Sequence, residues 1–355
     1  MQVRRAGCTF LAAVLVAGCA SIPGADEFRS GAAALPDAAL NGPVTDGRAR
    51  FREIFCDLAR RNAHVAEDDL LCDRLLWRLA DEPAAGASSV PPMAVDSRLR
   101  VFVVTGAFSD CFGPDALPYR SGIARMTGAG YRIETIEVSG RSSTGHNARQ
   151  IADALRAASP AESDRILLMG YSKGAIDILE FLDEYPDLAA RVSAVVSIAG
   201  AVMGTPLAEK GEWFYRKALA DTFAARCDPG DGGVLESLDP TVRRQWLADH
   251  PLPRHIAYLS LAAFTTREHL AHGLLPFWKM LAPFDPRNDG QILIGDAVIP
   301  GATLLGYANA DHWSIALGIE NELPHLAARS SGDQFPQDDL LEALVLFAAE
   351  ALAAR

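Results

Sequence analysis

The chain has 355 residues, of which 49% are hydrophobic and 22% are charged. This balance is typical of a globular protein with a sizeable core, and it excludes a largely disordered chain and a membrane protein with many spans. The formal net charge of -12 opposes binding to nucleic-acid backbones, and no basic run or zinc-knuckle spacing offsets it. We therefore expect one main folded domain and no nucleic-acid partner.

The N-terminus has the pattern of a targeting segment. Arg4 and Arg5 precede an apolar run over residues 10–17, which is too short to span a bilayer. A charged start followed by a short apolar run is typical of a cleaved signal peptide, here residues 1–18. The protein is therefore expected to be exported.

The end of this apolar run resembles the lipobox of bacterial lipoproteins, with the matching residues Leu15, Val16, Ala17, Gly18 and Cys19. The resemblance implies that Cys19 is diacylated, becomes the first residue of the mature chain and anchors the protein to a membrane of the cell envelope. Ala20 and Ser21 follow, rather than an aspartate, which favours the outer membrane, facing the periplasm or the surface. An ordinary leader with an incidental cysteine is the alternative.

Residues 19–47 are rich in Ala, Gly, Pro and Asp without periodicity, so they are expected to form a flexible tether. Residues 48–95 contain two short amphipathic segments, which predict a helical hairpin followed by a linker. Over residues 96–355 apolar runs alternate with amphipathic segments, which predicts an α/β domain with a doubly wound, mostly parallel sheet. Its expected strands cover 99–105, 131–138, 165–169, 192–198, 255–264 and 302–307.

Helices of this domain are expected over residues 147–158, 173–185, 270–281 and 338–354. The first begins with Asn147 and Gln150 in an arrangement that resembles a capping box. The strand–helix alternation stops over about 205–254, where aromatic residues gather, so this segment is expected to form a cap. A further helical insertion is expected over about 266–285.

The cysteines left after Cys8 and Cys19 are set aside allow three pairings, and they are Cys56, Cys72, Cys111 and Cys227. Export to an oxidising compartment would let them pair. A Cys56–Cys72 bridge is favoured, because it would staple the helical hairpin. A Cys111–Cys227 bridge would then join the loop after the first strand to the cap. Four buried free thiols are the alternative.

A Gly-x-Ser-x-Gly pentapeptide lies between an expected strand and an expected helix, and it consists of Gly170, Tyr171, Ser172, Lys173 and Gly174. A sharp turn at this junction would strain the backbone of the serine and hold its hydroxyl above the sheet. Gly170 and Gly174 suit the turn, because only glycine avoids clashes where the helix packs closely on the strand. The sequence thus predicts a nucleophile elbow at Ser172.

A serine hydroxyl needs a base within hydrogen-bond reach and an acid that holds this base in the right tautomer. His312 is the best-placed base, since it follows the last expected strand. His269 and His272 have a spacing that a metal pair could use, but no third ligand accompanies them and no metal site is expected. His146 lies in a glycine-bearing loop and could line the pocket.

Asp289 is the expected acid, because an Asp-Gly pair in a polar loop gives a tight turn that can direct the carboxylate toward a histidine. An Asx-turn without any catalytic part is the alternative for this residue. Asp285 and Asp296 are its nearest competitors, and Asp311 is expected to face away from His312.

Hydrolysis also needs donors for the negative charge that develops on the carbonyl oxygen. One is expected to be the N–H of Lys173, directly after the nucleophile, and the second the N–H of Ala107 or Phe108 in the loop after the first strand. The side chain of Lys173 is expected to point to solvent or to a neighbouring carboxylate.

These features together resemble the α/β-hydrolase superfamily, specifically its esterases and lipases, over residues 99–320. The resemblance implies a serine hydrolase that cleaves small-molecule or lipid-like carboxylic esters through an acyl-enzyme, and no cofactor is expected. One departure is the absence of a His-Gly-Gly-Gly motif after the first strand. Another is the helix expected between Asp289 and the strand that ends near Phe264. Thioesterase, amidase or peptidase activity remains an alternative, as does a non-catalytic envelope lipoprotein on the same scaffold.

Overall fold

The structure is a computed structural model, and it describes residues 24–36, 40, 42–62, 69–84, 96–113, 116–210, 228–320, 323–329 and 334–355. The expected signal peptide and Cys19 lie outside these residues. Residues 211–227, which include Cys227 and most of the aromatic residues of the expected cap, also lie outside the described residues. The bounds of the expected cap are therefore not tested over that range.

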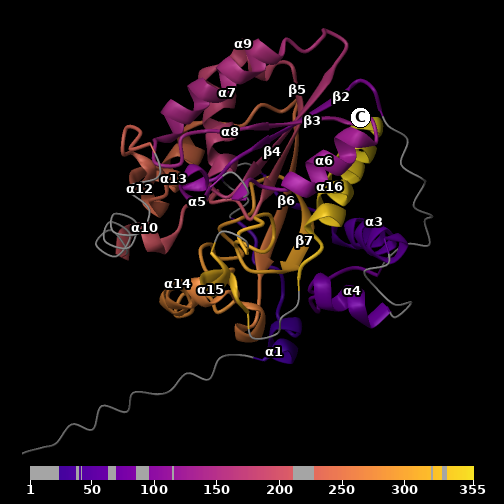
Figure 1. Cartoon of the computed structure of the whole chain (residues 1–355), viewed down its shortest axis with the longest axis vertical. Coiled ribbons are helices and arrows are strands. Elements are labelled where there is room, and N and C mark those ends of the chain that lie inside the picture. The colour runs from indigo at the N-terminus through magenta and orange to yellow at the C-terminus, as the bar shows by residue number, and fades with distance from the viewer. Residues whose placement is uncertain are drawn as a thin grey trace, which may run out of the picture.

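A seven-stranded parallel sheet forms the centre of the described molecule (Figure 1). Its order is β1-β7-β6-β5-β4-β2-β3, which confirms the doubly wound parallel sheet. All six expected strands are present. The bounds are β1 Thr45–Asp46, β2 Leu99–Val104, β3 Arg132–Ile136, β4 Arg165–Tyr171, β5 Val192–Ile198, β6 Ala257–Phe264 and β7 Thr303–Asn309.

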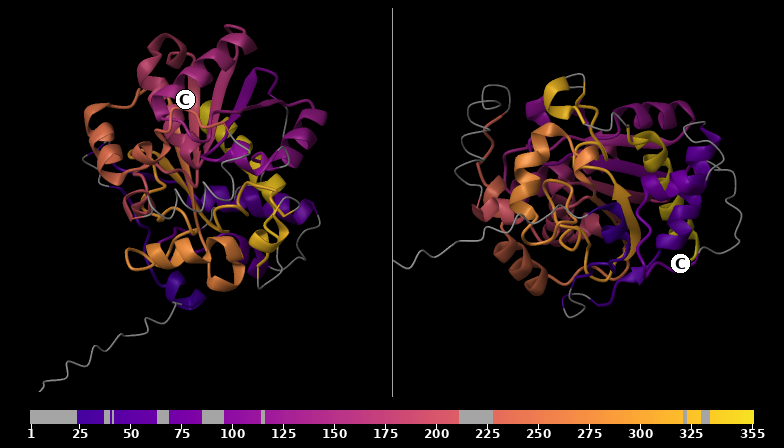
Figure 2. Two further views of the ribbon diagram at one scale, coloured as in Figure 1. Left: turned by 60° about the vertical axis from the view of Figure 1, so that its left-hand side comes forward. Right: turned by 90° about the horizontal axis from the view of Figure 1, so that it is seen from below.

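Helices cover both faces of the sheet (Figures 1 and 2). All six residues of strand β2 are buried, and its apolar residues alternate between two apolar clusters, one on each face of the sheet. Phe102 and Val104 belong to the cluster under α7 and α8, while Val101 and Val103 belong to the cluster that also contains residues of α3 and α16. The longer helices are α3 Arg48–Arg61, α6 Arg120–Gly128, α7 Thr144–Ala158, α8 Lys173–Glu184, α13 Pro240–Asp249 and α16 Gln337–Ala353.

The shorter helices connect these elements or extend from the sheet. They are α1 Ala25–Arg29, α4 Asp69–Leu75, α5 Ser109–Phe112, α9 Pro186–Ala189, α10 Pro206–Lys210, α12 Val234–Ser237, η2 Arg267–His269, η3 His272–Leu274, α14 Leu275–Leu281 and α15 Pro324–Ala327. None of the described helices is both long and apolar enough to cross a membrane.

Helix α7 corrects the expected capping box at Asn147. The helix begins three residues earlier, at Thr144, because the Ser143 hydroxyl accepts a hydrogen bond from the N–H of His146 and caps it. Asn147 and Gln150 instead contact the loop before the helix: the Asn147 amide donates to the Ser139 carbonyl, and Gln150 accepts from the Ser139 N–H. Both side chains bind the loop, and neither caps the helix.

The single helix expected over 270–281 is also corrected. Only α14 is α-helical in this range, and two short 3₁₀ turns, η2 and η3, precede it. Pro276 lies in the first turn of α14. Proline has no N–H and clashes with the preceding turn of a helix, so an α-helix can begin at this point but cannot continue through it.

The flexible tether expected over 19–47 is wrong for the two described segments of it that form α1 and β1. Phe28 in α1 is only 2% exposed and meets the rings of Trp77 and Phe264 edge-on. Strand β1 then pairs with β7 through Thr45 and Asp46. Helix α1 lies at the same end of the molecule as α14 (Figures 1 and 2). These elements are too short to leave a periodic pattern, although they bury an aromatic ring.

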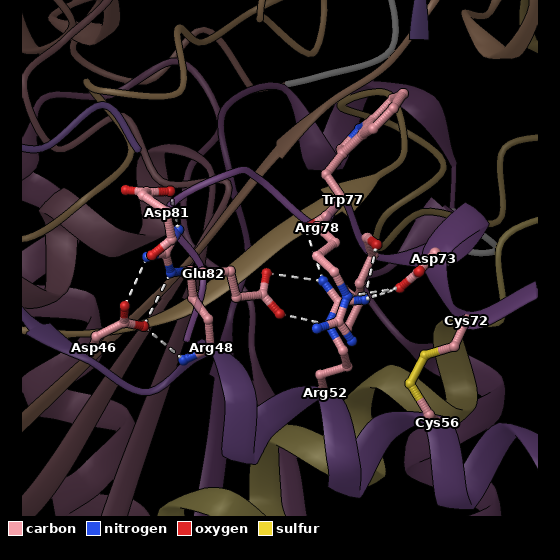
Figure 3. A network of polar contacts seen from close by, with 11 residues as sticks. Asp46, Arg48, Arg52, Cys56, Cys72, Asp73, Trp77, Arg78, Asp81 and Glu82 are labelled. Atoms are coloured by element: carbon pink, nitrogen blue, oxygen red, sulfur yellow. Dashed lines mark hydrogen bonds and ion pairs between the residues drawn. A yellow bond between two sulfur atoms is a disulfide. The ribbon is translucent and has the colours of Figure 1, made fainter. Parts of the chain in front are cut away.

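The expected disulfide between Cys56 in α3 and Cys72 in α4 is present (Figure 3). It joins the two helices of the expected hairpin. Cys111 is disulfide-bonded as well. Cys227, the partner expected for it, lies outside the described residues.

Candidate active site

Ser172 lies in a strained turn between β4 and α8. Its backbone has φ 56° and ψ -124°, a conformation that residues with a side chain rarely adopt. Two neighbouring glycines make the turn possible. A Cβ on Gly170 would lie 2.5 Å from backbone atoms of Ala175, and one on Gly174 would lie 2.5 Å from the Thr105 carbonyl oxygen. The turn expected at this pentapeptide is therefore present.

Three buried side chains lie in one hydrogen-bonded line at the carboxyl ends of the strands. The Ser172 Oγ is 2.9 Å from His312 Nε2, and His312 Nδ1 is 2.6 Å from Asp289 Oδ2. Ser172 is 8% exposed, His312 4% and Asp289 1%. The structure thus brings together the three residues that the sequence analysis selected, from three separate parts of the chain.

Asp289 also forms the Asx-turn that was considered as the alternative. Its Oδ1 accepts the N–H groups of Gln291 and Ile292 at 2.8 and 2.7 Å, which leaves Oδ2 for His312. The backbone adds a further contact, because the N–H of His312 donates to the Asp289 carbonyl at 2.8 Å. One carboxylate therefore both shapes its own loop and contacts the imidazole.

The competing aspartates lie elsewhere. Asp285 pairs with Arg287 at 2.9 Å. Burial raises the pKa of Asp296 to about 6, but this residue has no contact with His312. Asp311 faces away from the imidazole as expected: it accepts the N–H groups of Trp313 and Ser314 and pairs with Arg329 at 2.9 Å. Asp311 thus stabilises the turn that carries His312.

Tyr171 is a site residue that sequence reasoning missed. Its buried hydroxyl donates to the His312 carbonyl at 2.5 Å, and its ring lies 5.2 Å from the imidazole. Burial, together with the nearby charge of Asp289, raises the pKa of this phenol well above 10, so it stays a hydrogen-bond donor. The sequence gives no signal for this contact, because Tyr171 occupies a variable position of the pentapeptide.

Of the two residues expected to supply the second oxyanion donor, Phe108 is ruled out. The N–H of Phe108 donates to the Gly140 carbonyl at 3.0 Å and is not available for a substrate. The N–H of Ala107 has no acceptor among the described residues. Ala107 follows Gly106, where an added Cβ would lie 2.8 Å from the Ser172 Cβ. The loop therefore lies directly beside Ser172, and the N–H of Ala107 remains as the candidate second donor to the oxyanion.

The side chain of Lys173 is fully buried and does not point to solvent. Its Nζ lies 2.5 Å from Asp177 Oδ1, and Asn147 donates to the other oxygen of Asp177 at 2.8 Å. Burial lowers the pKa of Lys173 and raises that of Asp177, while their mutual attraction opposes both shifts. This buried pair anchors the first turn of α8 behind the elbow.

A pocket of about 480 Å³, including its opening, exposes Ser172 and His312 to a ligand. Its walls are largely apolar, and the polar residues that line it beside Ser172 and His312 are Tyr171, Thr205 and Gln291. Leu238, from the segment expected to form the cap, lies on one side. The apolar lining is completed by Ala107, Phe108, Phe112, Ile292, Trp313 and Leu317.

Other candidate residues lie outside this pocket. His146 occupies the first turn of α7 and is not among the described residues that line it. Within the described ranges, no cluster of three or more His, Cys, Asp or Glu side chains could hold a metal ion, and this covers His269 and His272.

Comparison with solved structures finds the metagenomic carboxyl esterase MGS0156, which is 36% identical over 92% of this chain and 98% of its own, with a TM-score of 0.80. The mature form of the lipase BlEst2 from Bacillus licheniformis is 21% identical over 63% of this chain and 89% of its own, with a TM-score of 0.50. At this lower identity the likeness concerns the fold alone. No protein-family model matches the sequence, and the curated proteins searched include no match.

Proposed function

The chain belongs to the α/β-hydrolase superfamily, and we propose that it hydrolyses carboxylic esters with Ser172 as the nucleophile. The observation that carries this proposal is the hydrogen-bonded line of Ser172, His312 and Asp289 at the base of an apolar pocket. The similarity to a carboxyl esterase over almost the whole chain supports the ester as the bond that is cleaved. The apolar walls suit an acyl group.

In the first half of the reaction, Ser172 Oγ attacks the ester carbonyl carbon while His312 Nε2 takes the hydroxyl proton. Asp289 stabilises the imidazolium that forms. The N–H groups of Lys173 and Ala107 donate to the oxyanion. His312 then gives the proton to the departing alcohol oxygen, and the carbon–oxygen bond breaks to leave an acyl group on Ser172.

In the second half, a water molecule takes the place of the alcohol. His312 removes a proton from this water, whose oxygen attacks the acyl carbon, and the same two N–H groups hold the second oxyanion. The proton then passes from His312 to Ser172 Oγ as the acyl bond breaks. The products are the free acid and the regenerated serine, with no other reactant consumed.

The test uses p-nitrophenyl esters of graded acyl length with the purified protein. Wild-type protein should hydrolyse them, and Ser172→Ala should lower kcat by about 10⁴-fold or more, because no other group can form the acyl-enzyme. Ser197→Ala is the matched control, since Ser197 is a buried serine of the neighbouring strand β5 that does not line the pocket. Undiminished turnover by Ser172→Ala would reject the proposal.

The bond that is cleaved can be tested with one acyl group presented as an ester, a thioester and an anilide. We expect the highest kcat/KM for the ester. A preference of tenfold or more for the thioester or the anilide would assign the same three residues to a different acyl transfer.

We also propose that the protein is exported and held at a membrane of the cell envelope through lipid on Cys19. The proposal rests on the N-terminal sequence, in which charged, apolar and small residues precede this cysteine. A lipid-like ester would then be available beside the enzyme.

A further inference from the structure

Residues 72–82, which we call the strap, meet the outer edge of β7 at Leu76 and Trp77. Leu76 forms an antiparallel bridge with Ala308, and the Trp77 N–H donates to the Tyr307 carbonyl at 2.8 Å. The Asn309 side chain donates to the Arg74 carbonyl at 2.7 Å. Asn309 ends β7 shortly before His312, so the strap fixes the point at which the loop with His312 leaves the sheet.

The strap also contacts the end of β6. The Trp77 ring stacks on Phe264 with 4.9 Å between centroids, and its Nε1 donates to the Phe264 carbonyl at 2.8 Å. The next residue, Thr265, donates from its hydroxyl to the Asn309 side chain at 2.7 Å. The carboxyl ends of β6 and β7 are therefore joined to each other and to the strap.

A second connection leads from the strap to the loop of Asp289. Asp81 accepts the N–H of Ala33 at 3.0 Å, which ties the segment after α1 to the strap. The neighbouring carbonyl of Ala32 accepts a hydrogen bond from Arg287 at 2.7 Å. Arg287 lies two residues before Asp289, so the N-terminal region contacts the loops of both the acid and the base.

Arg52 in α3 binds both ends of the strap and two of its backbone carbonyls (Figure 3). Its guanidinium binds both oxygens of Glu82 at 2.6 and 2.9 Å and Asp73 at 3.0 Å, and it donates to the carbonyls of Leu76 and Trp77 at 3.0 and 2.9 Å. The Arg52 side chain is only 6% exposed. A planar fork is required, because an ammonium group cannot reach these acceptors in several directions at once.

We propose that Arg52 is a positioning residue for ester hydrolysis. By holding the strap against the ends of β6 and β7, it keeps His312 and Asp289 aligned with Ser172. The inference rests on the proposed function. Under this proposal the N-terminal region, although it contains none of the three residues of the hydrogen-bonded line, affects the rate of ester hydrolysis. Misplacing catalytic groups by about 1 Å can cost about 100-fold in rate, so a partial loosening has a measurable effect.

The test compares Arg52→Lys with Arg50→Lys. Arg50 lies in the same helix and pairs with Glu350 at 2.7 Å and Glu53 at 2.8 Å, away from the strap. For a short-chain p-nitrophenyl ester, Arg52→Lys should lower kcat by about tenfold and change KM by less than about twofold, because the pocket is kept while the alignment is lost. Arg50→Lys should change neither. Labelling of Ser172 by a fluorophosphonate should slow by the same factor as kcat.

Concentrations of active protein are set by the final extent of labelling, and near-ultraviolet circular dichroism checks the fold. Equal kcat values for the two arginine variants, or an activity loss that only follows the amount of folded protein, would overturn the inference. If Arg52→Lys does not fold, Asn309→Ser replaces it, since this change at a half-buried site removes the hydrogen bonds that join the end of β7 to Arg74 of the strap and to Thr265 after β6. A wild-type kcat in that variant would also overturn it.

Ser172→Ala separates this inference from the proposed function. Full ester turnover by Ser172→Ala would reject the function itself. An inactive Ser172→Ala together with an unaffected Arg52→Lys would reject only the part assigned to the strap.

Discussion

The two carboxylate oxygens of Asp289 have different partners: one binds its own loop and the other binds His312. Because Oδ1 accepts two N–H groups of its own loop, the carboxylate cannot rotate freely, and Oδ2 stays directed at His312. The Tyr171 hydroxyl donates a hydrogen bond to the backbone carbonyl of His312. His312 is therefore held by side chains from two separate parts of the chain, strand β4 and the loop of Asp289, before any substrate arrives. Such preorganisation is a large part of catalysis by charge stabilisation.

Asp289→Asn tests this arrangement. An amide has no charge to stabilise the imidazolium and can present an N–H to His312 Nδ1, which selects the wrong tautomer. We expect kcat for ester hydrolysis to fall by roughly three to four orders of magnitude with the fold unchanged. Asp296→Asn makes the same chemical change outside the pocket and should keep the wild-type kcat. A loss of less than about tenfold in Asp289→Asn would assign the acid to another residue.

Asp296 gives a prediction about stability and pH. Burial raises its pKa from 3.8 to about 6. Between these values the folded state keeps a proton that the unfolded state has released, so the stabilising contribution is complete below pH 3.8 and is lost as the pH rises through 6. Asp296→Asn should raise the free energy of unfolding by up to about 3 kcal/mol at pH 7.5 and by little at pH 4. Urea unfolding at both pH values measures this, and a larger gain at pH 4 would contradict it.

Single residues were predictable from the sequence where chain order and turn chemistry select them. Ser172, His312 and Asp289 follow the order of the fold and lie at element junctions. The contact of Tyr171 with His312 and the hydrogen-bonded N–H of Phe108 were not predictable, because each depends on a contact between segments that are distant in sequence. Such contacts leave no local pattern.

At the scale of elements, length decides how much a sequence shows. Six of the seven described strands were predicted from the sequence. Most of them are buried on both faces and are therefore apolar almost throughout, while β3, whose burial alternates, was recognised between its neighbours. Helix α1 and strand β1 are only five and two residues long and were taken for a tether. The start of α7 was misplaced because Ser143, rather than Asn147, caps it.

The Cys56–Cys72 bridge gives a prediction for the elements that it joins. It closes a loop with a sequence separation of 16, and cross-linking a loop of this length restricts the unfolded chain by about 3 kcal/mol. The double variant Cys56→Ser/Cys72→Ser should lose about that free energy of unfolding, measured by urea titration. Wild-type protein under the same conditions is the reference. An unchanged midpoint would show that the bridge does not constrain the unfolded chain.

The whole molecule combines an α/β domain with an N-terminal region that packs on it, rather than a domain on a long tether. Helix α1 begins a few residues after Cys19, and Phe28 is buried between Trp77 and Phe264. If Cys19 carries lipid, the folded body would therefore lie close to the membrane surface. The sequence alone did not indicate this, because burial of one aromatic side chain depends on residues from distant parts of the chain.

The anchor itself can be tested in bacterial cells. Wild-type protein should sediment with membranes, and Cys19→Ser should appear in the soluble fraction, because the acyl chains supply the membrane affinity. The ester turnover per folded molecule should be equal in the two forms, since the change lies outside the pocket. Equal sedimentation of both forms would contradict lipid attachment at Cys19.

The central claim is that the Ser172 hydroxyl is the nucleophile, and covalent labelling tests it most directly. Wild-type protein treated with a fluorophosphonate should gain the mass of one adduct, peptide mapping should place it on Ser172, and ester hydrolysis should stop in proportion. His312→Ala should label far more slowly, because the serine loses its base. An adduct on another residue, or full ester turnover in protein whose Ser172 is labelled, would contradict the account.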